Sequence, residues 1–370
     1  MKVALVHDYL REFGGAERVL KVLTEIYPKA PIYTAFRVKN STADNEFKGK
    51  NIIESAFAPI LKIDNLYSPL RFLSPAIWKS FDLSKYDLVI TSSSWYITRG
   101  FRTSPGAKVV CYCHTPPRWL YGYETSIGLT KYWPVRMYAA IIGHFMRMYD
   151  FNSAQKIKYW IANSRNVQER IEKFYRKNSK VIYPPVNVEK IIEKTRKCKK
   201  KDYFLIVSRL VGAKGIEHAV SAFKSKPLSG YKLKIVGETQ GYSRLESEIK
   251  NNKTDNVELL GRVSDEVLWK LYAQARGFIA LARDEDFGMT PVESQAAGTP
   301  VIAFSGGGFK ETVIDGVTGI LINDTKKETI SNAIIKSNKR KWDVRKLREN
   351  AQRFSKEKFV NEVKNFIKGI

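Results

Sequence analysis

Short apolar runs, separated by amphipathic stretches, dominate the hydrophobic pattern of this chain. The runs of the first half are Val3–Val6, Leu88–Ile90, Val109–Cys113, Trp160–Ala162 and Val181–Tyr183. Those of the second half are Phe204–Val207, Leu233–Val236, Val257–Leu260, Phe278–Leu281 and Val301–Phe304. Runs of this length are typical of strands buried on both faces of a parallel sheet. Between them, apolar residues recur at helical spacing, as in Ala16, Val19, Leu20 and Leu23.

This alternation predicts an α/β chain with two doubly wound, Rossmann-like halves that face each other. The prolines of Tyr183–Val186 and the charged stretch Lys194–Asp202 indicate a linker between the halves. We therefore expect domains at 1–186 and 187–350. The stretch 343–370 is predicted to be helical, with Phe354, Phe359, Val363 and Phe366 on its apolar face, and its part 351–370 to pack back on the first domain.

Composition narrows the possible classes of protein. A chain of 370 residues that is 44% hydrophobic is long enough for two packed domains and is not mostly disordered. Its 63 Lys and Arg against 37 Asp and Glu give a net charge of +26, which predicts attraction to nucleic acid, an anionic membrane face or phosphorylated ligands. No apolar run reaches membrane-spanning length, and the apolar start is too short for a signal peptide.

Three cysteines exclude a disulfide framework and suit a reducing, cytoplasmic compartment. Cys111 and Cys113 share one face of a strand and are expected to be packed thiols. A zinc site at this point has only His114 as a further ligand nearby, so we expect no metal.

The most basic stretch of the chain, residues 101–185, carries 14 basic and 4 acidic side chains and overlaps a group of aromatic residues. These are Trp95, Tyr96, Phe101, Tyr112, Trp119, Tyr121, Tyr123, Tyr132, Trp133 and Tyr138. Such a mixture suits a lipid headgroup interface or stacking on nucleic acid. For most of these aromatics, a place in the core is the simpler interpretation.

Four segments follow predicted strands, where open parallel sheets bind ligands. Gly14 and Gly15 precede a helix, whose free N–H groups favour phosphate. Arg209 and Lys214 place two cations after another strand. His114 ends a third strand.

The fourth segment holds Glu285 and Glu293, eight positions apart. A capping box, with Thr290 as N-cap and Pro291 as the first helical residue, gives Glu293 a structural alternative. Asp286-Phe287-Gly288 matches a kinase triplet, but the other kinase motifs are missing from the sequence.

Taken in order, these segments resemble the retaining GT-B glycosyltransferases of family four (glycosyl transferases group 1), over nearly the whole chain. The pieces that carry the resemblance are Gly14–Glu17, Tyr112–Pro116, Ile161–Ser164, Ile182–Val186, Ser208–Gly215, Leu260–Asp265, the E-x7-E element Glu285–Glu293 and Ala297–Val301. The local sequences around His114 and Phe287 are most similar to those of the mannosyltransferases that build O-antigen and related surface polysaccharides. One departure is Gly215, where that branch would have a further basic residue.

The resemblance implies a role for each matched residue. Gly14 and Gly15 face the donor diphosphate, which Arg209 and Lys214 bind from the other domain. Glu285 holds a sugar hydroxyl, Glu293 holds the ribose, and His114 touches the sugar near the reacting carbon. The catalytic group is thus His114, Glu285, Arg209 and Lys214. The remaining donor-binding positions are Arg262, Val263, Phe287, Gly288, Met289 and Thr290.

We therefore expect a metal-independent hexosyltransferase, peripheral to the inner face of the plasma membrane. Its donor is a nucleotide sugar, GDP-mannose first and a UDP-sugar second, and its acceptor is a glycan or a polyprenyl-linked sugar. Transfer with retention is expected because no pair of carboxylates has evident nucleophile and acid roles. Two alternatives stay open: a sugar-nucleotide epimerase on the same fold, and a basic nucleic-acid-binding protein, although no recognition module is visible.

Overall fold

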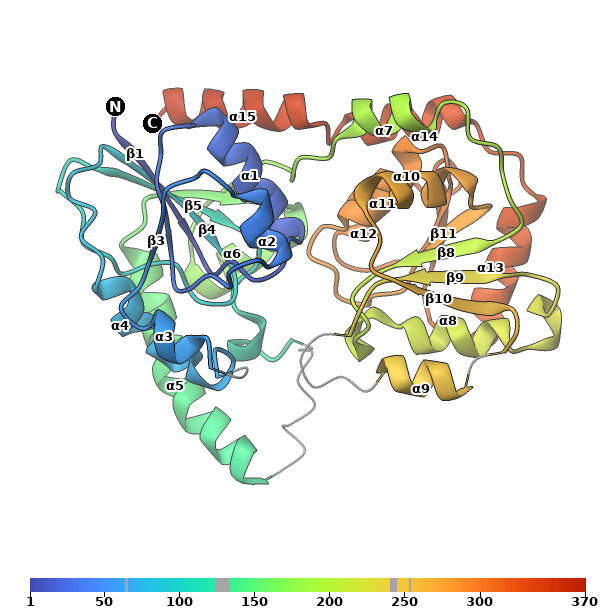
Figure 1. Ribbon diagram of the computed structural model, residues 1–370, viewed down its shortest axis with the longest axis horizontal. Helices are drawn as coiled ribbons and strands as arrows, with labels where there is room; N and C mark the ends of the chain where they lie inside the picture. Colours follow the sequence, from blue (N-terminus) through green and yellow to red (C-terminus); the bar gives the residue numbers. More distant parts are fainter. Residues whose placement is uncertain (64–65, 124–132, 240–244, 253) are drawn as a thin grey trace. The chain divides into compact units, whose positions relative to one another are not determined.

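The computed structural model describes residues 1–63, 66–123, 133–239, 245–252 and 254–370 (Figure 1). The chain forms two compact units. Among the described residues, the first comprises Met1–Tyr123, residues 133–185 and Phe359–Ile370, and the second Val186–Lys358. Tyr132 of the aromatic stretch lies outside the described residues.

The first unit is built on a seven-stranded parallel sheet of order β3-β2-β1-β4-β5-β6-β7. Its strands are β1 (Val3–His7), β2 (Ile32–Thr34), β3 (Ile52–Glu54), β4 (Leu88–Ser93), β5 (Lys108–Cys113), β6 (Tyr159–Ala162) and β7 (Lys180–Val181). Its helices are α1 (Gly15–Ile26), α2 (Thr42–Glu46), α3 (Ala58–Leu61), α4 (Ser74–Lys79), α5 (Trp133–Gln155) and α6 (Arg165–Tyr175), with short 3-10 turns η1 (Pro69–Leu73) and η2 (Arg118–Leu120). Helices cover both faces of the sheet, as predicted (Figure 1).

The second unit has a six-stranded parallel sheet of order β10-β9-β8-β11-β12-β13. Its strands are β8 (Phe204–Val207), β9 (Leu233–Val236), β10 (Val257–Gly261), β11 (Gly277–Ala280), β12 (Val301–Phe304) and β13 (Gly319–Ile322). Its helices are α7 (Val188–Thr195), α8 (Ile216–Phe223), α9 (Leu245–Asn252), α10 (Asp265–Gln274), α11 (Met289–Ala296), α12 (Phe309–Thr312), α13 (Lys327–Lys339) and α14 (Val344–Gln352), with 3-10 turns η4 (Gly212–Lys214) and η5 (Lys226–Leu228). Both α/β halves are thus present, and every predicted strand has a counterpart.

The end of the chain differs from the prediction of one helix over 343–370. Two helices form, α14 and then α15 (Lys356–Lys368). They are separated by a turn at Arg353 and Phe354 and by Ser355, which forms an isolated bridge with Val186, whose N–H donates to the Phe354 carbonyl (3.0 Å). Phe359 and Val363 of α15 are buried in one cluster with Leu5 of the first unit.

The charged stretch Lys194–Asp202 is only partly a solvated linker. Helix α7 ends within it at Thr195. The Lys200 ammonium donates to the carbonyls of Ala275 (2.8 Å) and Gly298 (3.1 Å), so this lysine is fastened to the second unit. In the part of the chain that the structure describes, no helix combines the length and the apolar character needed to cross a membrane.

Candidate active site

Polar side chains of three neighbouring strands meet at the carboxyl edge of the first sheet. Strands β1 and β4 are paired so that His7 lies opposite Ser92, and β4 and β5 so that Ser92 lies opposite Tyr112. His114 follows directly after β5. All three groups, His7, Ser92 and His114, are buried. The register of the sheet therefore brings together residues that are far apart in the sequence.

A continuous chain of hydrogen bonds joins these groups to the first helix. His114 Nε2 lies 2.8 Å from Ser92 Oγ, and Ser92 Oγ lies 3.0 Å from His7 Nδ1. His7 Nε2 lies 3.2 Å from Glu17 Oε1. Burial is the largest single effect and acts to raise the pKa of Glu17, but the hydrogen bond and charge interaction with His7, together with the backbone N–H groups of Glu17 and Gly14, hold the pKa below its usual value. Glu17 is therefore a carboxylate at neutral pH.

The charge of Glu17 sets the role of one nitrogen of His7. A carboxylate only accepts, so His7 must carry a proton on Nε2. Ser92 Oγ joins His7 Nδ1 to His114 Nε2, so one hydroxyl group connects the two rings.

The glycine loop before α1 is capped by the same carboxylate. Gly14 is the N-cap, Gly15 is the first helical residue, and the Gly14 N–H donates to Glu17 Oε2 (2.9 Å). The structure thus places Gly14 and Gly15 beside the His114 chain, at a helix N-terminus. One N–H group of the expected phosphate loop is already used by the protein.

Asp8 is a further buried acid at this edge. Its carboxylate accepts the Trp95 N–H (2.6 Å) and fastens the loop after β4. Burial raises the pKa of Asp8 to about 6, although His7 and the backbone N–H groups of residues 94–96 act in the opposite direction.

In the second unit, a cation and a carboxylate meet at the carboxyl edge of the sheet. Lys214 ends the 3-10 turn η4 after β8, and Glu285 lies in the loop after β11. Strands β8 and β11 are neighbours, and Lys214 Nζ lies 2.6 Å from Glu285 Oε2. Both side chains are about one-fifth exposed, so the pair is open to a ligand. Arg209 lies in the same β8 loop.

Gly215 explains the departure from the mannosyltransferase pattern. Its φ of +66° lies in the left-handed region, and an added Cβ would lie 2.9 Å from the carbonyl oxygen of Leu281. A basic side chain does not fit here without moving the loop that leads to Glu285.

The capping box predicted at Thr290 is wrong. Helix α11 begins at Met289 with Gly288 as its N-cap, so Thr290 is the second helical residue. The reason is the left-handed conformation of Gly288, whose φ of +89° turns the chain into the helix earlier. Glu293 instead accepts a hydrogen bond from the Tyr272 hydroxyl (3.0 Å) and is buried.

The loop that carries Glu285 rests on a second glycine segment, Gly306–Gly308, which the sequence interpretation missed. The Gly308 N–H donates to the carbonyl of Glu285 (2.8 Å). A Cβ at Gly307 would lie 2.2 Å from that same oxygen, so only glycine permits the approach. The buried ring of Phe287 packs against Phe354, with centroids 5.3 Å apart, and therefore acts as an anchor of the loop.

The remaining expected residues lie farther along the same edge. Arg262 and Val263 follow β10, the edge strand, and Arg262 is exposed. Strands β9 and β8 stand between them and the Glu285 loop. Cys111 and Cys113 are buried thiols that do not form a disulfide bond, and their packing was predicted. Among the described residues, no group of three or more His, Cys, Asp or Glu side chains is arranged to hold a metal ion.

The residues that the sequence interpretation missed are His7, Asp8, Glu17, Ser92 and Tyr272. His7 and Asp8 could have been found, because two polar residues directly follow the first apolar run. The partnership of Ser92 and of Tyr272 depends on strand register and helix packing, for which the sequence has no local signal.

Two family models cover most of the chain. Residues 13–190 match Glycosyltransferase Family 4, and residues 187–355 match Glycosyl transferases group 1. The fold agrees with these matches: HepE of Anabaena, solved with UDP and glucose, superimposes with a TM-score of 0.71 over 100% of both chains at 19% identity.

Several glycosyltransferases resemble this chain in sequence, at modest identity. An uncharacterized glycosyltransferase of Methanocaldococcus jannaschii is 27% identical over 59% of this chain and 59% of its own length. The alpha-1,3/1,6-mannosyltransferase ALG2 of Dictyostelium discoideum is 24% identical over 78% of this chain and 76% of its own. The O-antigen chain mannosyltransferase RfbU of Salmonella typhimurium is 31% identical over 47% and 50%. The chain therefore belongs to the family-four glycosyltransferases and has their GT-B fold.

Proposed function

We propose that the protein transfers a mannosyl group from GDP-mannose, with retention of anomeric configuration, to a glycan or lipid-linked acceptor of a cell-surface polysaccharide or glycolipid. The observation that carries this proposal is the 2.6 Å pair of Lys214 and Glu285. It supplies, on one open edge, a cation for a departing diphosphate and a carboxylate for a sugar hydroxyl.

The second unit is proposed to hold the donor. Arg209 and Lys214 bind the diphosphate, and the start of α11 after Gly288 directs N–H groups at the same anion. Glu285 accepts a hydrogen bond from a sugar hydroxyl. Glu293, oriented by Tyr272, accepts from the ribose hydroxyls, and Arg262 with Val263 line the base.

The chemistry needs stabilisation of opposite charges. As the bond from the anomeric carbon to the phosphate oxygen breaks, positive charge builds on the sugar and negative charge on the leaving diphosphate. Fixed cations stabilise that leaving group without reorganisation. The acceptor oxygen then bonds to the same face of the anomeric carbon, and its proton passes to the leaving phosphate oxygen. No protein nucleophile is needed.

The first unit is proposed to act on the sugar and the phosphate. His114, held by Ser92, forms a hydrogen bond with a sugar hydroxyl near the reacting carbon. Gly15 presents a helix N-terminus to the diphosphate.

The donor and the acceptor class rest on the relatives. Two of them are named mannosyltransferases, one of which acts on the O-antigen chain, and these names favour a mannosyl donor and a surface polysaccharide. Because the structural neighbour HepE was solved with UDP, a UDP-sugar is the second candidate donor.

Calorimetric binding of GDP, UDP and ADP with EDTA present tests the proposal without an acceptor. We expect GDP to bind most tightly, and Lys214→Ala to weaken binding. Preference for UDP would replace the donor and keep the site. Absence of binding by all three nucleotides would overturn the proposed site.

A further inference from the structure

Helix α5 is buried against the first unit at its C-terminal half, while in its N-terminal half the Tyr138 hydroxyl donates to the Pro69 carbonyl (3.1 Å). Met146 is buried in a cluster with Ile97 and Leu120. Asp150, also buried, accepts hydrogen bonds from the hydroxyls of Tyr121 (2.6 Å) and Tyr175 (2.9 Å). It also pairs with the buried guanidinium of Arg99. This network fixes the base of the helix firmly to the core.

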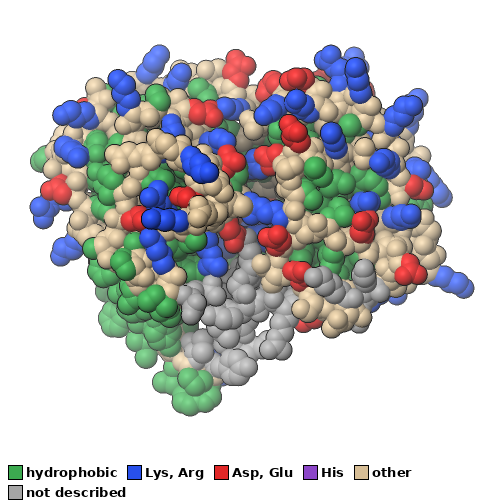
Figure 2. Space-filling view, viewed as in Figure 1, with side chains coloured by type: hydrophobic (Ala, Val, Ile, Leu, Met, Phe, Trp, Pro, Cys, Tyr) green, Lys and Arg blue, Asp and Glu red, His purple; other side chains and the backbone are tan. Residues whose placement is uncertain are grey.

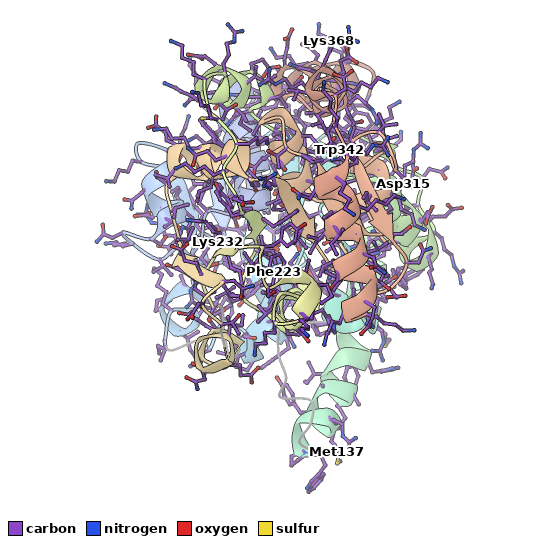
Figure 3. The ribbon with its side chains drawn as sticks, turned by 90° about the vertical axis from the view of Figure 1, so that its right-hand side faces the viewer. Met137, Phe223, Lys232, Asp315, Trp342 and Lys368 are labelled. Carbon is purple, nitrogen blue, oxygen red and sulfur yellow. The ribbon has the colours of Figure 1, made fainter. Side chains whose placement is uncertain are left out.

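The opposite side of α5 is an exposed apolar stripe. Its members recur at one face of the helix and are between 52% and 66% exposed: Trp133, Met137, Ile141, Phe145 and Met148. At 1.5 Å per residue the stripe is about 22 Å long. Hydrophobic side chains gather over the end of this helix in Figure 2, and Figure 3 shows Met137 at its projecting end. A contiguous apolar surface of this kind marks an interaction site.

The charged side chains that α5 itself exposes, Arg136 and Arg147, are both cationic. The sequence has no Asp or Glu from 125 to 149, whereas Arg136, His144 and Arg147 are exposed on α5. An open hollow of about 350 Å³ beside the stripe is lined by His144, Arg147, Met148, Phe151 and Asn152. Cations at the border of an apolar surface suit anionic headgroups above acyl chains.

We infer that α5 docks the first unit on an anionic bilayer, lying in the headgroup region with its stripe toward the acyl chains. Since α5 is not apolar enough to cross a membrane, the bilayer would be met from one side. That the acceptor is lipid-linked rests on the proposed function. The docking itself rests on the exposed apolar stripe and the cations of α5.

Flotation with vesicles of phosphatidylethanolamine, with and without phosphatidylglycerol, tests the inference. The full chain should float with the anionic vesicles and less with the neutral ones. Ile141→Glu with Phe145→Glu should lower the bound fraction at least about tenfold, because each adds an anion to a surface that must enter the headgroup region. Val267→Glu is the matched control: it changes an exposed apolar residue of α10 and should float as the wild type.

Two further measurements make the result decisive. Circular dichroism and GDP binding of the double variant should match the wild type, which separates failure of docking from misfolding or from failure of the proposed function. Arg136→Gln provides a second variant, which should weaken binding to anionic vesicles only. Unchanged flotation of the double variant would overturn the inference. The inference would also be overturned if the wild type were a dimer that does not bind vesicles and the double variant were a monomer. A second copy of the chain would then cover the stripe.

Discussion

The hydroxyl oxygen of Ser92 lies 2.8 Å from Nε2 of His114. The contact joins neighbouring strands whose pairing holds it, so a sheet rather than a flexible loop sets the orientation of the histidine. Because Ser92 also contacts His7, the hydrogen bonding of the His114 ring depends on groups that need not touch a substrate.

Ser92→Ala should therefore impair turnover more than donor binding. The buried Nε2 of His114 would lose its partner, at about 1–3 kcal/mol, which corresponds to roughly fivefold to 150-fold in kcat. Steady-state kinetics should show this fall with little change in KM for the donor. Nitrogen NMR of the labelled imidazole should show a changed Nε2 signal. Thr91→Ala, a buried hydroxyl on the opposite face of β4, is the control and should leave both readouts unchanged.

Lys214→Ala should raise the activation barrier by about 3–4 kcal/mol if the lysine stabilises the leaving diphosphate. This corresponds to a roughly hundredfold to thousandfold fall in kcat. Lys214→Arg keeps the charge and should retain part of the activity. Lys226→Ala, an exposed lysine of the same unit, should behave as the wild type. Equal activity of Lys214→Ala and Lys226→Ala would remove Lys214 from the diphosphate site.

Most of the sheet framework could be predicted because buried parallel strands have a strong local signal. Phe204–Val207 and Leu233–Val236 have the same limits in the sequence pattern and in the structure. The strands that were not predicted are β2 and β3, of three residues each, and β13, which follows a turn at Gly316. Short runs of this kind depend on neighbouring strands for their conformation.

The site was predictable only in part. Motif spacing gave His114, Lys214 and Glu285, but not their partners, because the partners come from strand register. The Thr290 cap failed because a left-handed Gly288 displaced the start of α11, a tertiary constraint that the local capping pattern does not contain. Helix α5 itself was not predicted: a headgroup interface was considered for its stretch, but most of the aromatics were interpreted as core residues, whereas Trp133 is exposed.

Glu293→Gln should weaken binding of the nucleoside diphosphate by about 1.5–3 kcal/mol if its carboxylate holds the ribose hydroxyls. Calorimetry with a 2′,3′-dideoxy nucleotide supplies the test: wild type and variant should bind this analogue equally. Tyr272→Phe, which removes only the donor to Glu293, should have a smaller effect. If Glu293→Gln discriminated between the nucleoside diphosphate and its 2′,3′-dideoxy analogue as strongly as the wild type, the ribose role of Glu293 would be contradicted.

Gly215→Ala should lower the free energy of unfolding by about 1–3 kcal/mol, because the left-handed backbone and the nearby Leu281 carbonyl both oppose a Cβ. Urea denaturation checks this. Gly212→Ala lies in the same loop, where an added Cβ meets no atom within 4 Å, and should be nearly neutral. Equal stability of the two variants would show that the loop tolerates a side chain at 215.

Asp8 should make stability depend on pH between about 4 and 6. Its pKa is raised from 3.8 to about 6 in the folded chain, chiefly by burial, so the folded state binds the proton more tightly than the unfolded state. The stabilisation from that proton is complete below pH 4 and is lost as pH rises through 6, with an upper limit of about 3 kcal/mol. Asp8→Asn keeps an oxygen for the Trp95 N–H but cannot titrate. Urea unfolding at pH 4, 5, 6 and 7 should therefore show the variant gaining stability relative to the wild type as pH rises. A constant difference across the series would show that Asp8 titrates normally.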